Sequence, residues 1–183
     1  MTTVIVDFKN KKVYADKTRT SLRDCTNSFL VRAFIGESAI DEYSHFDDGV
    51  CKLRTTSDGC ILTGAGNADV ISAFGKYPSC IPDTPKSSTD VVILRSKENA
   101  VRVIRYSCSD RNKIFGKKKW IETVNMKSEG YLVLGSGKNF ALGALYSGVS
   151  PAEAILAASK LDPFTSSSYD VQDIPNCEGD SNV

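Results

Sequence analysis

Short β-prone runs joined by very short turns constrain the fold of this chain more than any other feature. Residues 90–107 show this best, because "DVVILRS" and "AVRVIRYS" flank the three-residue turn "KEN". Runs rich in Val and Ile that are bounded by turn residues predict a β-hairpin. Residues 2–16 repeat the pattern, with "TTVIVDF" and "KKVYAD" separated by "KN". Since a hairpin joins antiparallel strands, we expect antiparallel sheets.

Further strands are expected along the rest of the chain. Residues 50–66, "VCKLRTTSDGCILTGAG", indicate a strand, a turn and a second strand. Residues 17–49 are polar and poorly periodic, apart from "SFLVRAFI", and predict no regular element. The remaining strand candidates are residues 117–126, 130–137 and 167–174.

Helical patterns lie between these strands and near the end of the chain. Residues 67–77 place apolar side chains at helical spacing, and a proline follows. Residues 135–148 indicate a glycine turn and then a helix that ends at a glycine. Residues 150–162 begin with a capping box, in which Ser150 is the N-cap and Glu153 the third helical residue. Strands with helices between and after them favour an α+β layer fold.

The length and composition predict one soluble domain. The chain has 183 residues, of which 41% are hydrophobic and 25% charged, as in ordinary globular proteins. Without internal repeats or a linker, we expect a single domain over residues 1–174. The polar end, residues 175–183, predicts a disordered tail.

The charge balance argues against several function classes. The 23 basic and 22 acidic residues give a net charge of +1, which provides no general field for nucleic acid or an anionic membrane. The lysine-rich "KIFGKKKW" is interpreted as solvated loop and edge-strand lysines rather than a nucleic-acid patch. No apolar run is long enough for a membrane span, and the first twenty residues do not resemble a signal peptide. We therefore expect a cytoplasmic protein.

Cysteine and histidine usage narrows the chemistry. The six cysteines include no C-x-x-C pair, and a chain of this size needs no disulfide, so we expect reduced and mostly buried thiols. His45 is the only histidine and is expected in a surface loop, so a two-histidine zinc site is excluded. No metal or cofactor is predicted. A hydrolase with this composition is expected to use a general base other than histidine.

Thr2 offers such a base. Methionine is normally trimmed before a small residue, and its removal would leave a threonine with a free α-amino group. Such an amine titrates near about 7.7–8.0, so it can act as a base toward the threonine's own hydroxyl. The alternative is that Thr2 is only the polar edge of the first strand.

Three later stretches could support chemistry. "LTGAG" leads from a strand into a helix, so the Gly66 N–H could act as an oxyanion-hole donor, or the glycine could simply make a tight turn. "VLGSGKN" lacks the spacing of the P-loop, which argues against nucleotide binding. Asp162 lies at a helix C-terminus, where a carboxylate is unfavourable, so it needs another reason to be there.

Taken in order, four stretches resemble the proteasome β-subunit and HslV family of N-terminal nucleophile (Ntn) hydrolases. They are "TTVIVDFKNKKVYAD", "KLRTTSDGCILTGAGNAD", "YLVLGSGKNFALGAL" and "GVSPAEAILAASKLDPFTSSSYDVQDI". The resemblance covers about three quarters of the chain. The resemblance implies an α+β fold, a four-layer α/β/β/α sandwich with two antiparallel sheets. Because only one short helix fits after residue 66, one helix layer should be reduced.

The resemblance also implies roles for single residues. Thr2, after removal of Met1, would be the nucleophile, with Asp16 and Lys52 as the charged pair beside it and Gly66 as the oxyanion donor. Ser136, Asp162 and Thr165 match the supporting cluster of hydroxyls and carboxylate around the threonine amine.

The separation of Asp16 and Lys52 departs from the family's pattern. Either residues 20–49 are an insertion, or Arg32 takes the basic position. Lys52 is preferred because it lies in the predicted strand-turn-strand segment of residues 50–66, which matches the context of the basic residue in the family. The hydroxyl-rich turn after Thr165 also replaces a more glycine-rich one.

The sequence thus predicts a threonine-type peptidase that forms an acyl-enzyme on Thr2. The expected partners are a peptide or protein substrate and further copies of the chain, with an ATPase unfoldase left open. The alternative is a catalytically inactive Ntn-fold scaffold or binding protein.

Overall fold

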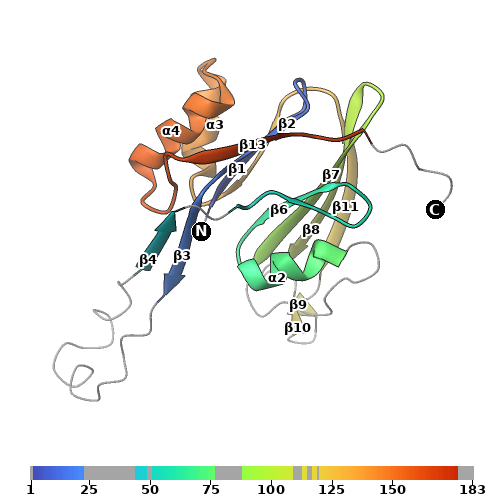
Figure 1. Ribbon diagram of the computed structural model, residues 1–183, viewed down its shortest axis with the longest axis horizontal. Helices are drawn as coiled ribbons and strands as arrows, with labels where there is room; N and C mark the ends of the chain where they lie inside the picture. The colour runs from blue at the N-terminus through green and yellow to red at the C-terminus, as the bar shows by residue number, and fades with distance from the viewer. Residues whose placement is uncertain are drawn as a thin grey trace.

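A computed structural model gives the fold of the chain. The structure describes residues 2–22, 44–48, 51–76, 88–108, 113–114, 117–118 and 120–176, and Figure 1 shows the ribbon. Among them no helix has the length and apolar character needed to cross a bilayer.

The first sheet is built around the N-terminal hairpin. Its four strands run in the order β12-β1-β2-β13, and all neighbouring pairs are antiparallel. β1 and β2 are the predicted hairpin, and they place the start of β1 beside the end of β2. The bounds are β1 Thr3–Asp7, β2 Lys12–Asp16, β12 Tyr131–Gly135 and β13 Tyr169–Asp173.

The second sheet is built around the other predicted hairpin. Its order is β11-β8-β7-β6-β5, again with antiparallel neighbours. The bounds are β5 Arg54–Thr55, β6 Ile61–Ala65, β7 Thr89–Lys97, β8 Ala100–Cys108 and β11 Ile121–Lys127.

Two small sheets hold the remaining strands of the described residues. β3 (Thr18–Leu22) pairs with β4 (Ser44–Asp48), and the pair extends away from the two main sheets in Figure 1. β9 (Lys113–Ile114) pairs with β10 (Lys117–Lys118).

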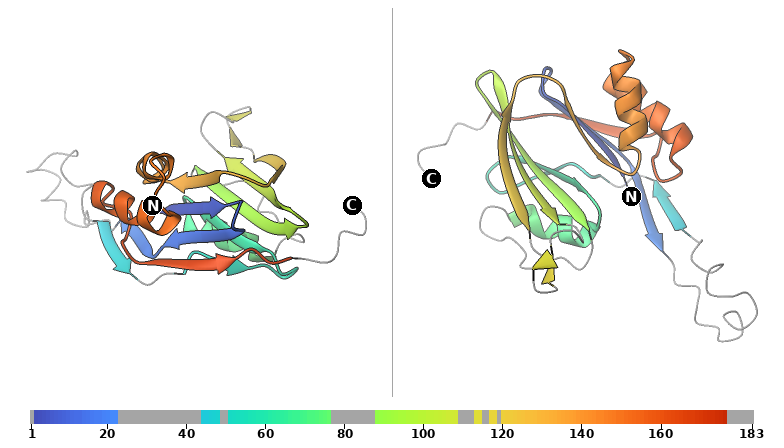
Figure 2. Two further views of the ribbon diagram at one scale, coloured as in Figure 1. Left: turned by 90° about the horizontal axis from the view of Figure 1, so that it is seen from above. Right: turned by 180° about the vertical axis from the view of Figure 1, so that it is seen from behind.

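Alternation along the strands creates three apolar layers. In β1, Val4 and Val6 face the space between the sheets, while Ile5 faces the opposite side. That opposite side is covered by α3 (Lys138–Tyr146) and α4 (Pro151–Leu161), as Figures 1 and 2 show. The outer face of the second sheet packs on α2 (Ala68–Ala73) and the 3₁₀ helix η2 (Phe74–Lys76), where Phe74 is fully buried.

The molecule is therefore a four-layer α/β/β/α sandwich with one reduced helix layer, as the sequence predicted. Among the described residues, the reduced layer holds the six residues of α2 and the three of η2, against eleven residues in α4 alone. The predicted helix ends are also confirmed. Ser150 and Glu153 form the capping box of α4, and Gly148, with φ of 91°, follows the end of α3.

Some predictions of local structure were wrong. Residues 17–49 were expected to hold no regular element, yet β3 and β4 lie there, so the backbone of His45 is in a strand rather than a loop. Pro175 and Asn176 were assigned to a disordered tail, but the Ser96 N–H donates to the Pro175 carbonyl at 2.9 Å. Residues 177–183, the rest of that predicted tail, lie outside the described residues, as does most of the predicted insertion at 20–49.

The described cysteines are free thiols. Cys60 and Cys108 are buried, and Cys51 is exposed. The other three cysteines lie outside the described residues, at positions 25, 80 and 177.

Candidate active site

The N-terminal hairpin brings the first two candidate residues together. Because β1 and β2 are antiparallel and Val4 faces Ala15, the residues before β1 lie beside Asp16 at the end of β2. Thr2 is 4% exposed and Asp16 is fully buried. The Thr2 hydroxyl donates to Oδ1 of Asp16 at 2.6 Å.

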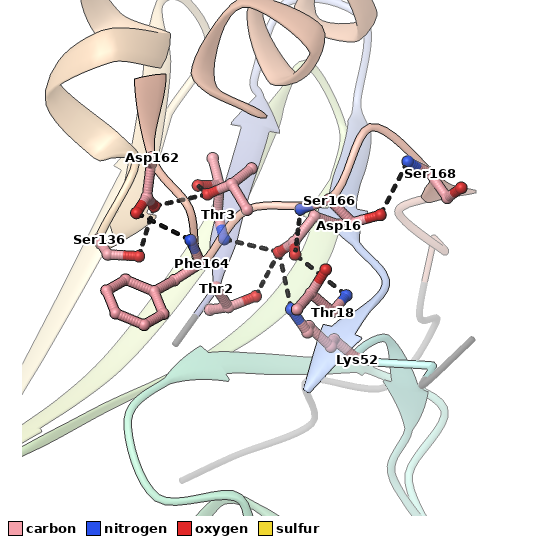
Figure 3. Close-up of polar contacts among 11 residues, drawn as sticks. Thr2, Thr3, Asp16, Thr18, Lys52, Ser136, Asp162, Phe164, Ser166 and Ser168 are labelled. Carbon is pink, nitrogen blue, oxygen red and sulfur yellow. Dashed lines mark hydrogen bonds and ion pairs between the residues drawn. The ribbon is translucent and has the colours of Figure 1, made fainter. Parts of the chain in front are cut away.

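Asp16 is the centre of a dense set of hydrogen bonds. Figure 3 shows Thr2, Lys52 and the Thr3 backbone converging on one carboxylate oxygen, Oδ1. The Thr3 N–H donates to this oxygen at 2.7 Å. Oδ2 accepts the backbone N–H groups of Thr18 at 3.1 Å and Ser166 at 3.2 Å. The carboxylate thus joins β1, the start of β3 and the turn before β13.

Lys52 is the basic residue that meets Asp16. Its Nζ lies 2.7 Å from Oδ1, and its side chain is 12% exposed. The neighbouring Leu53 is buried between the two sheets, which holds this segment against the hairpin. Arg32, the alternative basic residue, lies outside the described residues.

A second carboxylate cluster surrounds Asp162. This residue is the C-cap of α4 and is 5% exposed. Its Oδ2 accepts the hydroxyls of Ser136 at 2.6 Å and Thr165 at 2.7 Å, and its Oδ1 accepts the Phe164 N–H at 3.1 Å. These donors compensate a buried negative charge, which would otherwise be unfavourable at a helix C-terminus.

The two clusters are joined through the first residues of the chain. The Ser136 N–H donates to the Thr2 carbonyl at 3.0 Å. The hydroxyls of Thr3 and Thr165 lie 2.7 Å apart. The structure therefore brings Thr2, Asp16, Lys52, Ser136, Asp162 and Thr165 into one connected network.

Gly66 lies outside that network of contacts. It follows β6 with φ of 122° and is exposed. A Cβ at this position would lie 2.6 Å from the Ser88 carbonyl oxygen, so both the backbone conformation and the space require glycine. In the described part of the chain, no hydrogen bond connects Gly66 to Thr2 or to either carboxylate.

The glycines of the "GSG" stretch explain the close packing around Thr2. A Cβ on Gly135 would lie 1.6 Å from the Thr2 carbonyl oxygen, and its φ is 99°. A Cβ on Gly137 would lie 2.3 Å from the Thr3 hydroxyl and 2.7 Å from the Thr165 hydroxyl. The two glycines therefore permit the start of β1 to approach the start of α3.

Gly137→Ala is expected to destabilise the fold and to separate the Thr3 and Thr165 hydroxyls. The added methyl group overpacks a buried site, which typically costs about 1–3 kcal/mol. The free energy of unfolding in urea measures the effect. The matched control is Gly143→Ala in α3, because Gly143 is exposed and a Cβ there meets nothing within 4 Å. Since alanine favours helix by about 1 kcal/mol, this control should be stabilising, and equal losses in both variants would contradict the assignment.

Electrostatics near the site involve one more ion pair. Lys17 follows Asp16, and its Nζ lies 2.8 Å from Asp170 in β13. The hydrogen bond to Asp170, with the attraction of its charge, raises the pKa of Lys17. Lys17 therefore stays positively charged at neutral pH beside the Asp16 cluster.

The buried thiol of Cys60 offers no competing nucleophile. Burial is the main cause that raises the pKa of the Cys60 thiol to about 11. The hydrogen bond from Arg95 lowers this pKa, and the contact with Asp58 raises it further. A thiol attacks as the thiolate, so Cys60 is poorly reactive at neutral pH. No group of three or more metal-binding side chains occurs within the described ranges.

Sequence reasoning missed four members of the network. Thr3 was treated only as part of a strand, and the backbone N–H groups of Thr18, Phe164 and Ser166 carry no sequence signal at all. For Thr3, the available signal was a second hydroxyl directly after the candidate nucleophile, in a strand that is otherwise apolar.

The fold resembles that of a solved structure. No protein-family model matches the chain, and a search of curated proteins finds no match. Among solved structures, the chain is similar to eukaryotic HslV from Trypanosoma brucei, with 16% sequence identity and a TM-score of 0.54. The alignment covers 95% of this chain and 99% of that one. The chain thus has an HslV-like fold.

Proposed function

We propose that this protein is an N-terminal threonine hydrolase, a proteasome-like peptidase that cleaves a peptide or protein substrate through an acyl-enzyme on Thr2. The observation that carries the proposal is the convergence on Asp16. Its Oδ1 accepts the Thr2 hydroxyl at 2.6 Å and the Lys52 ammonium at 2.7 Å. A hydroxyl, a cation and a carboxylate are thereby held together in a buried site on an HslV-like fold.

The reaction begins with the removal of Met1. Hydrolysis of the Met1–Thr2 peptide bond leaves a free α-amino group on Thr2. The positive charge of Lys52 disfavours protonation of this amine and lowers its pKa, so the neutral form is available as a base. The amine then takes the proton of the Thr2 hydroxyl as the oxygen attacks the substrate carbonyl carbon.

The substrate then passes through two half-reactions. In the first, the carbonyl oxygen becomes negatively charged, and the Gly66 N–H stabilises it. The amide C–N bond breaks, its nitrogen takes the proton, and an ester remains on Thr2. In the second, water attacks the ester carbon and releases the carboxylic acid product, and the Thr2 hydroxyl regains its proton.

Ser136, Asp162 and Thr165 support the Thr2 amine and its proton relay in this proposal. Ser136 donates its N–H to the Thr2 carbonyl at 3.0 Å and its hydroxyl to Asp162 at 2.6 Å. Ser136 therefore links the negative charge of Asp162 to the proposed nucleophile, because it donates a hydrogen bond to each of the two residues.

The removal of Met1, which would make Thr2 the N-terminal residue, tests the proposal most directly. Intact mass spectrometry of the protein from its native host should show loss of Met1. Incubation with a threonine-directed covalent inhibitor should then add one inhibitor mass, located on Thr2 by peptide mapping. Retained Met1 together with absence of labelling would instead support the alternative, an inactive Ntn-fold scaffold or binding protein.

The setting of the enzyme is also proposed from the resemblance. We place it in the cytoplasm as a homo-oligomer, with an ATPase unfoldase as a candidate partner and with neither nucleic acid nor membrane as a ligand. Exposed apolar side chains on the helix layer, such as Tyr146 at 87% and Leu161 at 62% exposure, support an assembly contact there.

A further inference from the structure

Thr3 contacts both carboxylate clusters of the site. It is the first residue of β1 and is fully buried. Its backbone N–H donates to Asp16 Oδ1 at 2.7 Å, and its hydroxyl lies 2.7 Å from the Thr165 hydroxyl. Figure 3 shows Thr3 between Asp16 and Asp162.

Counting protons fixes the direction of the hydroxyl contact. Thr165 has a single hydroxyl proton, and it donates this proton to Asp162 Oδ2 at 2.7 Å. An ionised carboxylate only accepts, so the Thr165 oxygen must accept in its other contact. Thr3 is therefore the donor, and a directed chain runs from Thr3 through Thr165 to Asp162.

The peptide group between Thr2 and Thr3 is held at both ends. Its carbonyl oxygen accepts the Ser136 N–H at 3.0 Å, and its N–H donates to Asp16 at 2.7 Å. Two bonds on opposite edges of one planar group fix the orientation of that plane. The Cα of Thr2 is attached to this plane, so its position is fixed as well.

We propose that Thr3 is a positioning residue that fixes Thr2 for attack by anchoring the Thr2–Thr3 peptide group between Asp16 and the Thr165–Asp162 chain. This inference rests on the proposed function. The two backbone bonds hold the peptide plane, and the Thr3 hydroxyl adds a side-chain bond to Thr165 that ties the same residue to the Asp162 cluster. The close approach of Gly137, where a Cβ would lie 2.3 Å from the hydroxyl, also restricts this oxygen to one place.

The test compares Thr3→Val with Thr3→Ser in protein whose intact mass confirms Thr2 as the first residue. Valine has the shape of threonine without the hydroxyl, and serine keeps the hydroxyl. For cleavage of a fluorogenic peptide, we expect Thr3→Val to lower kcat about tenfold with KM within about twofold, and Thr3→Ser to restore most of kcat. A merely structural role would lower thermal stability without this separation of kcat from KM.

Thr63→Val is the matched control. Thr63 is also a fully buried strand threonine, but within the described residues its hydroxyl has no hydrogen-bond partner. Replacing it should leave kcat unchanged. If Thr3→Val does not fold, Thr165→Val breaks the same hydrogen bond from the other side and should also lower kcat with little change in KM.

Each outcome decides between the claims. Wild-type kcat in Thr3→Val, or in Thr165→Val when it is the variant measured, overturns the positioning role while leaving the proposed function intact. A similar loss of kcat in Thr63→Val also overturns it. Absence of both peptide cleavage and inhibitor labelling in the wild-type protein that begins at Thr2 overturns the proposed function, and the role of Thr3 with it.

Discussion

Thr2→Ala is expected to abolish peptide cleavage, with kcat lowered at least about a thousandfold. The variant removes the only atom proposed to form the bond with the substrate. It also prevents formation of the ester intermediate, so no covalent adduct with a threonine-directed inhibitor should appear. Fluorogenic peptide cleavage and intact mass spectrometry measure the two effects.

The fold should tolerate this substitution. Asp16 Oδ1 still accepts the Thr3 N–H and the Lys52 ammonium after the Thr2 hydroxyl is removed. The thermal midpoint is therefore expected to change little. Thr2→Ser, which keeps a hydroxyl and an α-amino group, is the matched variant and should retain measurable activity. Cleavage by Thr2→Ala at the wild-type rate would show that another residue carries the chemistry.

Asp16→Ala is expected to have the largest effect on stability, about 3–5 kcal/mol. The fully buried carboxylate accepts five hydrogen bonds, three of them from backbone N–H groups. Its removal takes a shared acceptor from those donors and takes one anionic partner from the Lys52 ammonium, whose side chain is 12% exposed. Urea denaturation followed by circular dichroism measures the loss.

Asp170→Ala is the matched control for this prediction. It also removes an aspartate paired with a lysine, because Asp170 lies 2.8 Å from Lys17, but both side chains are about a third exposed, at 28% and 33%. Partly exposed pairs are screened by solvent and typically contribute below about 1 kcal/mol. If the two variants lost equal stability, burial of the Asp16 cluster could not be the cause.

The sequence predicted those parts of the fold that local patterns determine. Alternating apolar residues and tight turns predicted the two central hairpins, and Ser150 with Glu153 predicted the start of α4. β3 and β4 were missed because "TRTSL" and "SHFDD" lack an alternating apolar pattern. Their pairing is a backbone interaction between segments that are distant in sequence, and no local signal reports it.

The candidate site was predicted in its residue types but not in its connections. Thr2, Asp16 and Lys52 were chosen by resemblance, and their contacts depend on strand register, which a one-residue shift would change completely. The participation of Thr3 follows from the same register. The contributions of the Thr18 and Ser166 N–H groups depend only on where the backbone passes, so no residue type could have indicated them.

Asp16 and Lys52 lie 36 positions apart along the chain, and this separation has a consequence for variation in chain length. The entropy lost in closing a loop grows only with the logarithm of its length, about 0.6 kcal/mol for each doubling. The pairing of β3 with β4 also closes the base of this loop next to the ion pair. The entropic cost of closing the chain between Leu22 and Ser44 therefore changes little with the number of residues there, and the Asp16–Lys52 contact lies outside that span.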